Sequence, residues 1–453
     1  MTTERRELVE RIWARDPTVW TAKDEARWLG WLDEPARGRE DVDLLLTLAD
    51  DVAGEIDDVV LLGMGGSSLA PEVMRRAFGG ERFHVLDSTH PRTIRRLADA
   101  LDLGRTLFIS ASKSGSTLET RSHTDYFWKL APRGAQWVAI TDPGSELEAL
   151  ARARGFRAVF AGEPTIGGRY SALSPFGLVP AALLQLDVAR LLDRALEMVE
   201  ACQLDEGNPG LDLGLALGEG WQEGRDKVCF DDVNGFGLWV EQLLAESTGK
   251  QGKGLVPAPG EPAAGPDRQG HEVRLESPYE LGQEFFRWEF ATAVAGSILG
   301  INPFDQPDVQ AAKDKTSEIL STGKQPPLEP QGSVEELAVQ AREGDYVAIL
   351  AFVEPTDANE RVLLGVAERL RRETGCVVTH GFGPRYLHST GQLHKGGPNT
   401  GLFLQVVEDY GDELKIPDRP FGFARLIRAQ AAGDFDSLRE RGRRVARVQI
   451  GDL

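Results

Sequence analysis

Cysteine is scarce in this 453-residue sequence. The three cysteines, Cys202, Cys229 and Cys376, lie far apart and lack the spacing of metal ligands. A small odd number of distant cysteines offers no disulfide framework and no zinc site, and it is typical of a protein from a reducing cytoplasm. Long apolar runs and a start resembling a signal peptide are also missing, so we expect a soluble protein.

Positive charge is in short supply as well. The chain has 51 Lys and Arg against 71 Asp and Glu, a formal net charge of −20. This balance argues against a nucleic acid or an anionic membrane as the main partner. An anionic substrate would therefore need a pocket that is locally basic and rich in backbone N–H groups. With 41% hydrophobic residues, the chain is long enough to form two or more domains.

One cofactor-binding signature is incomplete, and one catalytic signature is absent. Gly63 and Gly65 supply the first two glycines of a dinucleotide-binding G-x-G-x-x-G turn, but Ser68 stands where the third belongs. A nicotinamide site is therefore the less favoured interpretation of this turn. The sequence has no G-x-S-x-G elbow, which disfavours a serine hydrolase.

A strand followed by a run of hydroxyl side chains is the most informative segment. Residues 107–109 are apolar, residues 110–117 contain four serines and a threonine, and a helix is predicted from Leu118. Such a turn gathers hydroxyls and backbone N–H groups at the positive end of a helix, which suits a phosphate dianion. An ordinary serine-rich loop with a helix cap is the alternative. The density of hydroxyls, with Gly115 allowing close approach, favours phosphate.

Strands and helices alternate throughout the first half. Further strands are predicted at residues 59–62, 83–89, 136–142 and 156–162, with helical segments between them. This alternation predicts a doubly wound parallel sheet, whose ligands lie beyond the carboxyl ends of the strands. The glycine turn and the hydroxyl loop should therefore be neighbours across one crevice. Residues 1–55 are predicted to form amphipathic helices that cap this domain.

Three motifs of the first half resemble those of glucose-6-phosphate isomerases, within the sugar isomerase (SIS) superfamily. SKSGSTLE resembles the phosphate signature S-x-S-G-x-T-x-E, GMGGS resembles G-I-G-G-S, and GGRYS resembles G-G-R-[YF]-S. On its own the last motif is a turn with an arginine in a surface ion pair; the resemblance makes Arg169 the stabiliser of a developing oxyanion. The resemblance also implies substrate contacts from Gly66, Ser67, Ser112, Lys113, Ser114 and Thr117.

The second half adds two further resemblances. QLLAES, on a predicted helix at residues 238–254, resembles Q-x-x-x-E-S, which implies a substrate contact from Gln242 and makes Glu246 the catalytic base. The two side chains are four residues apart and share a helix face. NPFDQPDVQAAK resembles the family's F-D-Q signature, which implies a substrate contact from Gln306 and a ring-opening role for Lys313.

LHSTGQ resembles the segment around the family's catalytic histidine, which points to His388. In the family this histidine precedes the lysine motif, whereas here it follows it. Either the second domain is rearranged or the local match is fortuitous, and His394 and His271 are the alternatives.

The resemblance covers about residues 58–401 and is closest to the short or transaldolase-fused bacterial type. It implies an α/β fold of two SIS-type doubly wound parallel-sheet domains, α-β-α sandwiches with flanking helices. Residues 1–200 would hold the N-terminal helices and the first domain. Residues 201–453 would hold the second domain, with an extra βα unit and a basic helical tail at residues 423–445.

The implied reaction interconverts glucose 6-phosphate and fructose 6-phosphate through a cis-enediol. Proton transfer of this kind needs an acid, a base and an oxyanion stabiliser, so no cofactor and no metal is expected. The expected partner is a small sugar phosphate, with no nucleic acid or membrane. By resemblance we also expect a cytoplasmic homodimer. A dual phosphoglucose/phosphomannose isomerase and a non-catalytic SIS sensor of sugar phosphates remain alternatives.

Overall fold

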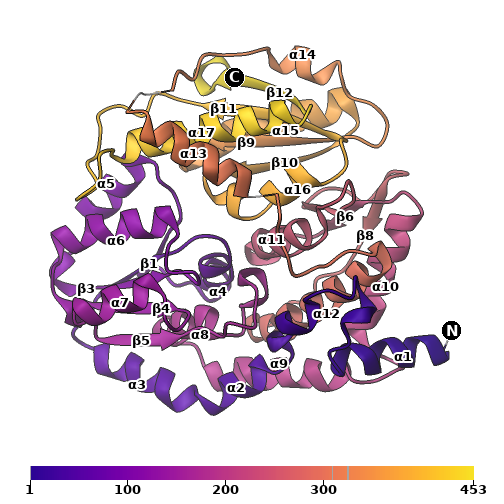
Figure 1. Ribbon diagram of the computed structural model, residues 1–453, viewed down its shortest axis with the longest axis horizontal. Helices are drawn as coiled ribbons and strands as arrows, with labels where there is room; N and C mark the ends of the chain where they lie inside the picture. The colour runs from indigo at the N-terminus through magenta and orange to yellow at the C-terminus, as the bar shows by residue number, and fades with distance from the viewer. Residues whose placement is uncertain (1, 309, 324–325) are drawn as a thin grey trace.

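The computed structural model describes residues 2–308, 310–323 and 326–453. Its described strands form three sheets, and every strand pairing within them is parallel. The indigo-to-magenta first half lies below the orange-to-yellow four-stranded unit in Figure 1. None of the described helices combines the length and apolar composition that crossing a bilayer requires.

The first sheet has five strands in the order β2-β1-β3-β4-β5. All five residues of β4 and all six of β3 are buried, as expected for a parallel sheet covered by helices on both faces. The strands are β1 (Asp58–Leu62), β2 (Phe83–Leu86), β3 (Thr106–Ala111), β4 (Trp137–Thr141) and β5 (Ala158–Ala161). The helices between them are α4 (Leu69–Phe78), α5 (Pro91–Ala100), α6 (Leu118–Leu130) and α7 (Glu146–Ala153).

The strand order places the point of reversal between β1 and β3. From β1 the chain moves outward to β2, then returns to β3 on the other side of β1 and continues to β4 and β5. The connections after β1 and β3 therefore leave in opposite directions and open a crevice at the carboxyl ends of these strands. The glycine turn follows β1 and the hydroxyl loop follows β3, as the sequence predicted.

The N-terminal segment packs against both halves of the chain and not only against the first sheet. Trp20 donates through its indole N–H to the carbonyl of Ala293, at 2.7 Å, and Trp31 stacks on Tyr170 with ring centroids 5.3 Å apart. Ala293 lies on the long helix α12 of the second half. The helices of the N-terminal segment are α1 (Thr2–Trp13), α2 (Glu34–Glu40) and α3 (Val42–Val52). The helices that lie next to them are α8 (Pro175–Leu183), α9 (Val188–Ala201), α10 (Pro209–Gln222) and α12 (Leu281–Leu299).

The strands of the second half divide into two sheets. The three-stranded sheet has the order β7-β6-β8 and the four-stranded sheet has the order β10-β9-β11-β12. The three-stranded sheet contains β6 (Lys227–Phe230), β7 (Val256–Pro259) and β8 (Arg268–Gly270). The other contains β9 (Tyr346–Phe352), β10 (Val377–Phe382), β11 (Gly401–Val407) and β12 (Arg444–Gln449).

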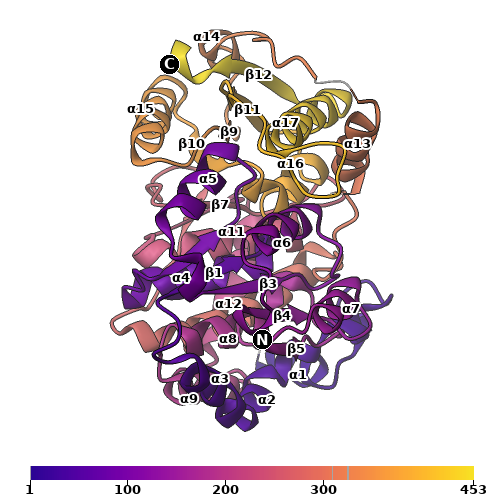
Figure 2. The same cartoon turned by 90° about the vertical axis from the view of Figure 1, so that its left-hand side faces the viewer.

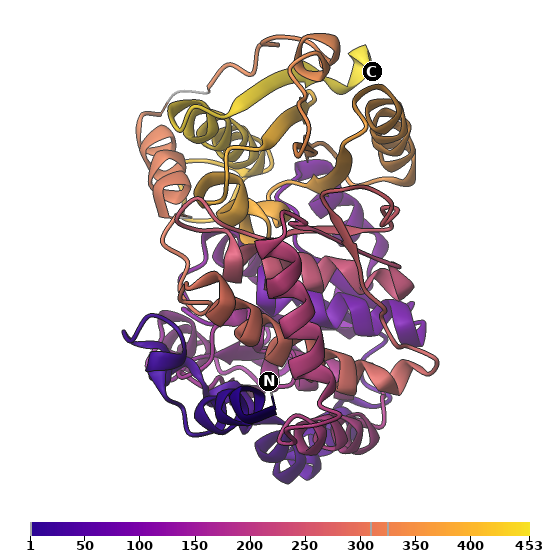
Figure 3. The same ribbon diagram turned by 90° about the vertical axis from the view of Figure 1, so that its right-hand side faces the viewer.

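Helices accompany these sheets. Figure 3 shows the rose-coloured segment with β6 and β8 between the yellow four-stranded unit above and the helices below. The remaining helices of the second half are α11 (Gly237–Thr248), α13 (Gln310–Ser321), α14 (Val334–Ala338), α15 (Asp357–Thr374), α16 (Gly391–Gly396) and α17 (Phe423–Glu440).

Two local predictions for the second half are wrong. The tail at 423–445 is helical only to Glu440, because Gly442 turns the chain with a φ of 68° and the following residues form β12. In β12, Ala446 and Val448 are buried, and so is Arg447, whose guanidinium donates to the Gln405 amide oxygen. The helix predicted at residues 238–254 ends at Thr248, and the chain then enters β7 at Val256. The division at residues 200/201 stays a prediction, and it falls at the end of α9.

Figure 2 shows α5 of the first half reaching the four-stranded unit. Arg92 on this helix pairs with Glu354, at 3.0 Å, and with Glu408, at 2.7 Å. This contact ties the first sheet to the segment that carries the candidate histidine.

Candidate active site

The hydroxyl loop after β3 forms one wall of the crevice. Ser112 is buried and its hydroxyl lies 2.9 Å from that of Thr117, which precedes α6. Gly115 has a φ of 69°, a conformation that suits glycine and lets the loop fold back on itself. Ser114 and Ser116 hydroxyls lie 3.1 Å apart on the exposed side. The loop thus gathers its hydroxyls at the N-terminus of a 13-residue helix, where the helix dipole favours an anion.

Lys113, in the same loop, is turned to a different neighbour. Its ammonium group donates to both carboxylate oxygens of Asp142, at 2.8 and 2.6 Å, and to the carbonyl of Glu163. This ion pair holds the loop against the segment after β4. The predicted substrate contact of Lys113 stays a prediction, and the contacts that the structure shows for it are structural.

The glycine turn after β1 packs directly on the G-G-R turn. A Cβ on Gly66 would lie 1.9 Å from the carbonyl oxygen of Gly168, so only glycine fits this contact. Ser67 is buried at the same turn. Gly168 begins the 3-10 helix η7 (Gly168–Tyr170), which also carries Arg169. The close contact between the two turns therefore fixes the backbone position of Arg169.

Arg169 is buried, only 2% exposed, and makes no surface ion pair. Its guanidinium donates to the Ser247 hydroxyl at 2.7 Å and to the Gln306 amide oxygen at 2.8 Å. It also donates to the carbonyls of Pro303, at 2.6 Å, and Asp305, at 3.0 Å. These bonds join η7 to α11 and to the turn before α13, and they orient the cation.

The carboxylate of Glu246 lies next to this cation. Its Oε2 is 3.8 Å from Nη1 of Arg169 and accepts a hydrogen bond of 3.1 Å from Gln242, one helical turn earlier on α11. The Glu246 side chain is 13% exposed, so it faces the crevice without being freely solvated. The structure thus brings Glu246, Gln242, Arg169 and Gln306 together.

A buried lysine completes this cluster. Lys250 lies just after α11, is 1% exposed and donates to the Asn302 carbonyl at 2.8 Å and to a carboxylate oxygen of Asp305 at 2.6 Å. Burial, together with the neighbouring Arg169, lowers the pKa of this lysine to about 8. The base therefore lies in a region with two nearby cations.

His388, Lys313 and the hydroxyl loop line one cavity of about 290 Å³, to which Ser114, Thr117 and Glu119 also contribute. Nε2 of His388 lies 3.0 Å from Oε1 of Glu119, and Gln430 donates to the same oxygen at 2.7 Å. Burial alone would raise the pKa of Glu119, but His388 and Lys313 outweigh it and lower this pKa to about 2. Glu119 is therefore ionised and holds the histidine.

The two clusters meet at the glycine turn. A Cβ on Gly65 would lie 2.8 Å from Nε2 of Gln242 and 2.8 Å from the carbonyl oxygen of His388. Gly65 thus separates the helix that carries Glu246 from the 3-10 helix η10 (Arg385–His388). The other two candidate histidines lie elsewhere: His394 is buried among Tyr346, Tyr386 and Phe403, and His271 is hydrogen bonded to Gln269.

Residues 49–202 match the family model described as phosphoglucose isomerase. The similar proteins include the glucose-6-phosphate isomerase of Thermus thermophilus, 37% identical over 264 residues, which cover 54% of this chain and 62% of the relative. The enzyme of the same name from Rubrobacter xylanophilus is 29% identical over 375 residues, covering 61% of this chain and 86% of the relative. The segment 49–202 therefore resembles the phosphoglucose isomerase family. The chain spans about three fifths of the length of the Thermus relative.

Solved structures show the same α/β fold. A hypothetical protein from Thermus thermophilus has a TM-score of 0.50 and 23% identity, over 99% of this chain and 83% of that one. A glucose-6-phosphate isomerase from Chlamydia trachomatis has a TM-score of 0.58 and 18% identity, over 71% and 84%.

Two residues of the site were not singled out from the sequence. Glu119 is the last residue of the hydroxyl signature, but its pairing with His388 spans 269 positions, which no local pattern reveals. Lys250 follows Glu246 by four residues, and that spacing was a usable signal. Among the described residues, no group of three or more His, Cys, Asp or Glu is arranged to hold a metal ion.

Proposed function

We propose that this protein interconverts glucose 6-phosphate and fructose 6-phosphate through a cis-enediol intermediate, a reaction of glycolysis and gluconeogenesis. The observation that carries the proposal is the placement of the Glu246 carboxylate 3.8 Å from the buried Arg169 guanidinium. A base beside a fixed cation is what proton abstraction next to a carbonyl requires.

The phosphate group would bind at the hydroxyl loop. Ser112, Ser114 and Thr117 offer hydroxyls, and the N-terminus of α6 offers backbone N–H groups. Ser67 lies on the facing glycine turn. Holding the phosphate there fixes one end of the sugar while its carbon chain extends along the crevice.

The sugar ring would be opened by the pair at the neighbouring cavity. Lys313 and His388 line the same space as the hydroxyl loop. One group protonates the ring oxygen while the other takes the proton from the O1 hydroxyl, which breaks the C1–O5 bond and frees the carbonyl. Glu119 keeps the imidazole in place through its 3.0 Å contact.

Glu246 would then move a proton between the two reacting carbons. It removes the proton from C2 of the open-chain aldose, and the electron pair passes to O1 to form the enediolate. O1 then gains a proton and O2 loses one, and return of the carbon-bound proton from Glu246 to C1 gives the ketose, with the new carbonyl at C2. Arg169 faces the developing negative charge, and Gln242 and Gln306 hold the carboxylate and the guanidinium in register.

The key experiment compares the parent protein with Glu246→Gln in the conversion of fructose 6-phosphate to glucose 6-phosphate. The substitution keeps size and hydrogen bonding but removes the base, so turnover should fall about 10²-fold or more. Sugar-phosphate binding should survive. Glu219→Gln, on the exposed face of α10, is the control and should retain parent turnover.

Exchange of solvent deuterium into C2 of glucose 6-phosphate gives a second readout. Exchange by Glu246→Gln at the parent rate would show that another group is the base. A parent protein that binds fructose 6-phosphate without turnover would instead be a sensor. Turnover of mannose 6-phosphate in the same assay would extend the proposal to a dual isomerase, because both C2 epimers share the enediol.

The state of assembly and the location belong to the same proposal. We propose a cytoplasmic homodimer, in keeping with the family resemblance and with three free, buried cysteines. His388 already contacts Glu119 of its own chain, so a second copy is not needed to bring the imidazole to the cavity. Sedimentation of the active protein tests the dimer, and a monomeric mass with full activity would exclude it.

A further inference from the structure

A second cavity, of about 390 Å³, lies where α11, α15, β10 and η10 meet. None of the described residues assigned to the isomerase reaction lines it. Its volume falls within the range of small-molecule sites, about 300–1,000 Å³. The cavity is therefore large enough for a compact ligand and is separate from the crevice in which sugar phosphate is proposed to react.

The side chains that line this cavity have an excess of negative charge. Five of the described lining residues are acidic and two are basic. Both basic residues are already paired with carboxylates: Arg385 binds Asp87 through two hydrogen bonds, of 2.6 and 2.8 Å, and Arg76 binds Glu72 at 2.7 Å. Each basic side chain of the described lining thus already has a carboxylate partner, and Arg385 is the one that also attracts Glu241.

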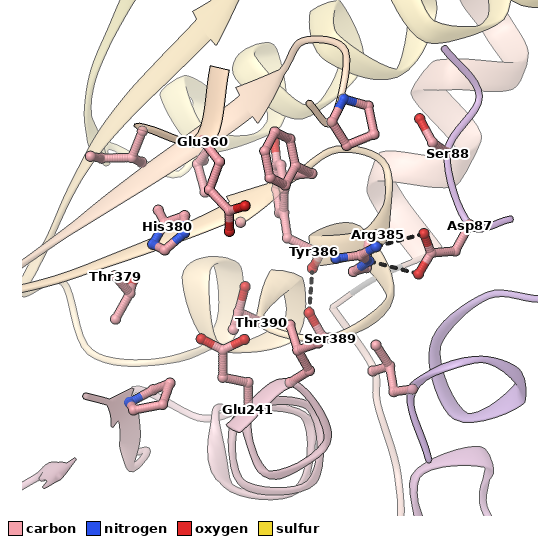
Figure 4. Close-up of a pocket in the computed structure, with 18 of the residues that line it drawn as sticks. Asp87, Ser88, Glu241, Glu360, Thr379, His380, Arg385, Tyr386, Ser389 and Thr390 are labelled. Atoms are coloured by element: carbon pink, nitrogen blue, oxygen red, sulfur yellow. Dashed lines mark hydrogen bonds and ion pairs between the residues drawn. The ribbon is translucent and has the colours of Figure 1, made fainter. Parts of the chain in front are cut away.

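Two carboxylates reach the cavity from opposite walls, one from half-buried Glu241 and the other from exposed Glu360. Figure 4 shows Glu241 on α11 and Glu360 on α15 pointing into the same space, with Thr390 beside the former and His380 beside the latter. Neither carboxylate forms a hydrogen bond or ion pair with any described residue. Burial, reinforced by Asp232, raises the pKa of Glu241 to about 8, and the attraction of Arg385 opposes this rise only in part.

An independent observation concerns a buried imidazole. His394 lines the cavity, is 3% exposed, and its Nδ1 has no hydrogen-bond partner among the described residues. A buried polar atom without a partner costs free energy, so such atoms are rare unless something binds them. The hydroxyls of Thr390 and Ser389 line the same wall and offer further acceptors.

We propose that this cavity binds a small organic dication, a linear diamine whose two ammonium groups pair with Glu241 and Glu360. The hydroxyl of Thr390 accepts a further hydrogen bond, and the methylene chain lies against the apolar side chains of Leu350 and Val378. An ammonium group donates three hydrogen bonds and accepts none, which matches a wall of carboxylate and hydroxyl oxygens.

The cavity adjoins the two structural elements that carry candidate reaction residues. Glu241 precedes Gln242 on α11, and Ser389 and Thr390 directly follow His388. Arg385 belongs to the same 3-10 helix as His388. A bound dication therefore contacts both elements that hold the candidate base and the candidate histidine.

The test is titration calorimetry of the whole protein with 1,4-diaminobutane, with 1,4-butanediol as the neutral isostere. Saturable binding of the diamine with one site per chain, and no binding of the diol, is the expected result. The Glu241→Gln/Glu360→Gln double variant should bind at least about tenfold more weakly, since it removes both charge pairs. Glu368→Gln, an exposed glutamate elsewhere on α15, should bind as the parent does.

Three outcomes would overturn the proposal: no binding of the diamine, equal binding of the diol, or unchanged affinity in the double variant. A further outcome is that potassium or magnesium chloride displaces the diamine as well as unlabelled diamine does, at the same total concentration of positive charge. That result would assign the cavity to an inorganic cation and would also overturn the proposal. Thr390→Val, with parent-like circular dichroism, provides a second variant in case the double variant does not fold. It should weaken diamine binding, and parent affinity in that variant would count against the proposal. Because binding is measured directly, the result is independent of whether the protein is an isomerase.

Discussion

Arg169→Lys separates the structural role of the guanidinium from its proposed role in catalysis. The substitution keeps a positive charge but replaces a planar fork, which makes four hydrogen bonds, with a single ammonium group. The Asp305 carbonyl keeps a donor, because Lys250 also binds it. The Pro303 carbonyl and the Ser247 hydroxyl are buried and would lose theirs.

The expected loss of stability follows from these two groups. A buried acceptor left without a donor costs about 1–3 kcal/mol, so the free energy of unfolding should fall by about 2–6 kcal/mol. Domains typically have about 5–15 kcal/mol in total, so the variant should still fold but unfold at lower urea concentration. Turnover should fall further than folding explains, by about 10²–10³, because one donor aimed at the developing oxyanion is displaced.

The assay measures urea unfolding and then kcat for fructose 6-phosphate, corrected for the folded fraction. Arg287→Lys is the matched control: Arg287 is 4% exposed, makes three hydrogen bonds through its guanidinium, and lies on α12 away from the crevice. It should lose stability and keep kcat. A folded Arg169→Lys protein with kcat within about threefold of the parent would refute the electrostatic role.

Three further predictions concern the loops and the histidine. Glu119→Gln removes a carboxylate whose pKa is lowered by folding from 4.5 to about 2. This shift contributes about 3 kcal/mol to the free energy of unfolding above pH 4.5, and the contribution disappears as the pH falls toward 2. The stabilities of parent and variant, measured by unfolding, should therefore converge over that pH interval. The double variant Ser114→Ala/Thr117→Val should raise the inhibition constant for inorganic phosphate, whereas Ser333→Ala, which removes a helix-capping hydroxyl at α14, should not. An inhibition constant for the double variant equal to that of the parent would show that phosphate binds elsewhere. Gly66→Ala should reduce soluble, folded protein because its Cβ would meet the Gly168 carbonyl at 1.9 Å, while Gly168→Ala, with open space around its Cβ, should express and melt like the parent.

The first half of the fold was predictable because its signals are local. Each strand of the first sheet is a short apolar run, and each is followed by a turn whose glycines or hydroxyls end it. The prediction of a doubly wound parallel sheet follows from these units, whereas the order β2-β1-β3-β4-β5 is known from the structure. The position of the hydroxyl loop beside the glycine turn could be predicted from this sheet alone, because both follow strands at their carboxyl ends.

The second half was less predictable, because its pairings are decided by tertiary contacts. Residues 444–449 follow helix α17 and contain two arginines, and their strand conformation depends on pairing with β11. Lys113 shows the same limit within the site: its motif predicts a substrate contact, but Asp142, 29 residues later, binds its ammonium group. Glu119 likewise finds Gln430 across 311 positions.

The order of the motifs along the chain has a consequence that can be measured. The histidine segment follows the lysine segment here, and the folded chain brings His388 to its own Glu119 at 3.0 Å. If the histidine acts within its own chain, a mixture of Glu246→Gln and His388→Ala proteins, unfolded and refolded together, should regain no activity, since every active site lacks one group. If the histidine instead serves a neighbouring copy, half of the dimers would be hybrids with one intact site each, and about a quarter of the parent activity would return. Refolding the parent with an equal amount of Glu246→Gln controls for recovery and should give about half of the parent activity in either case. A return near a quarter would show that the histidine crosses between copies, and the assignment of His388 to its own chain would be wrong.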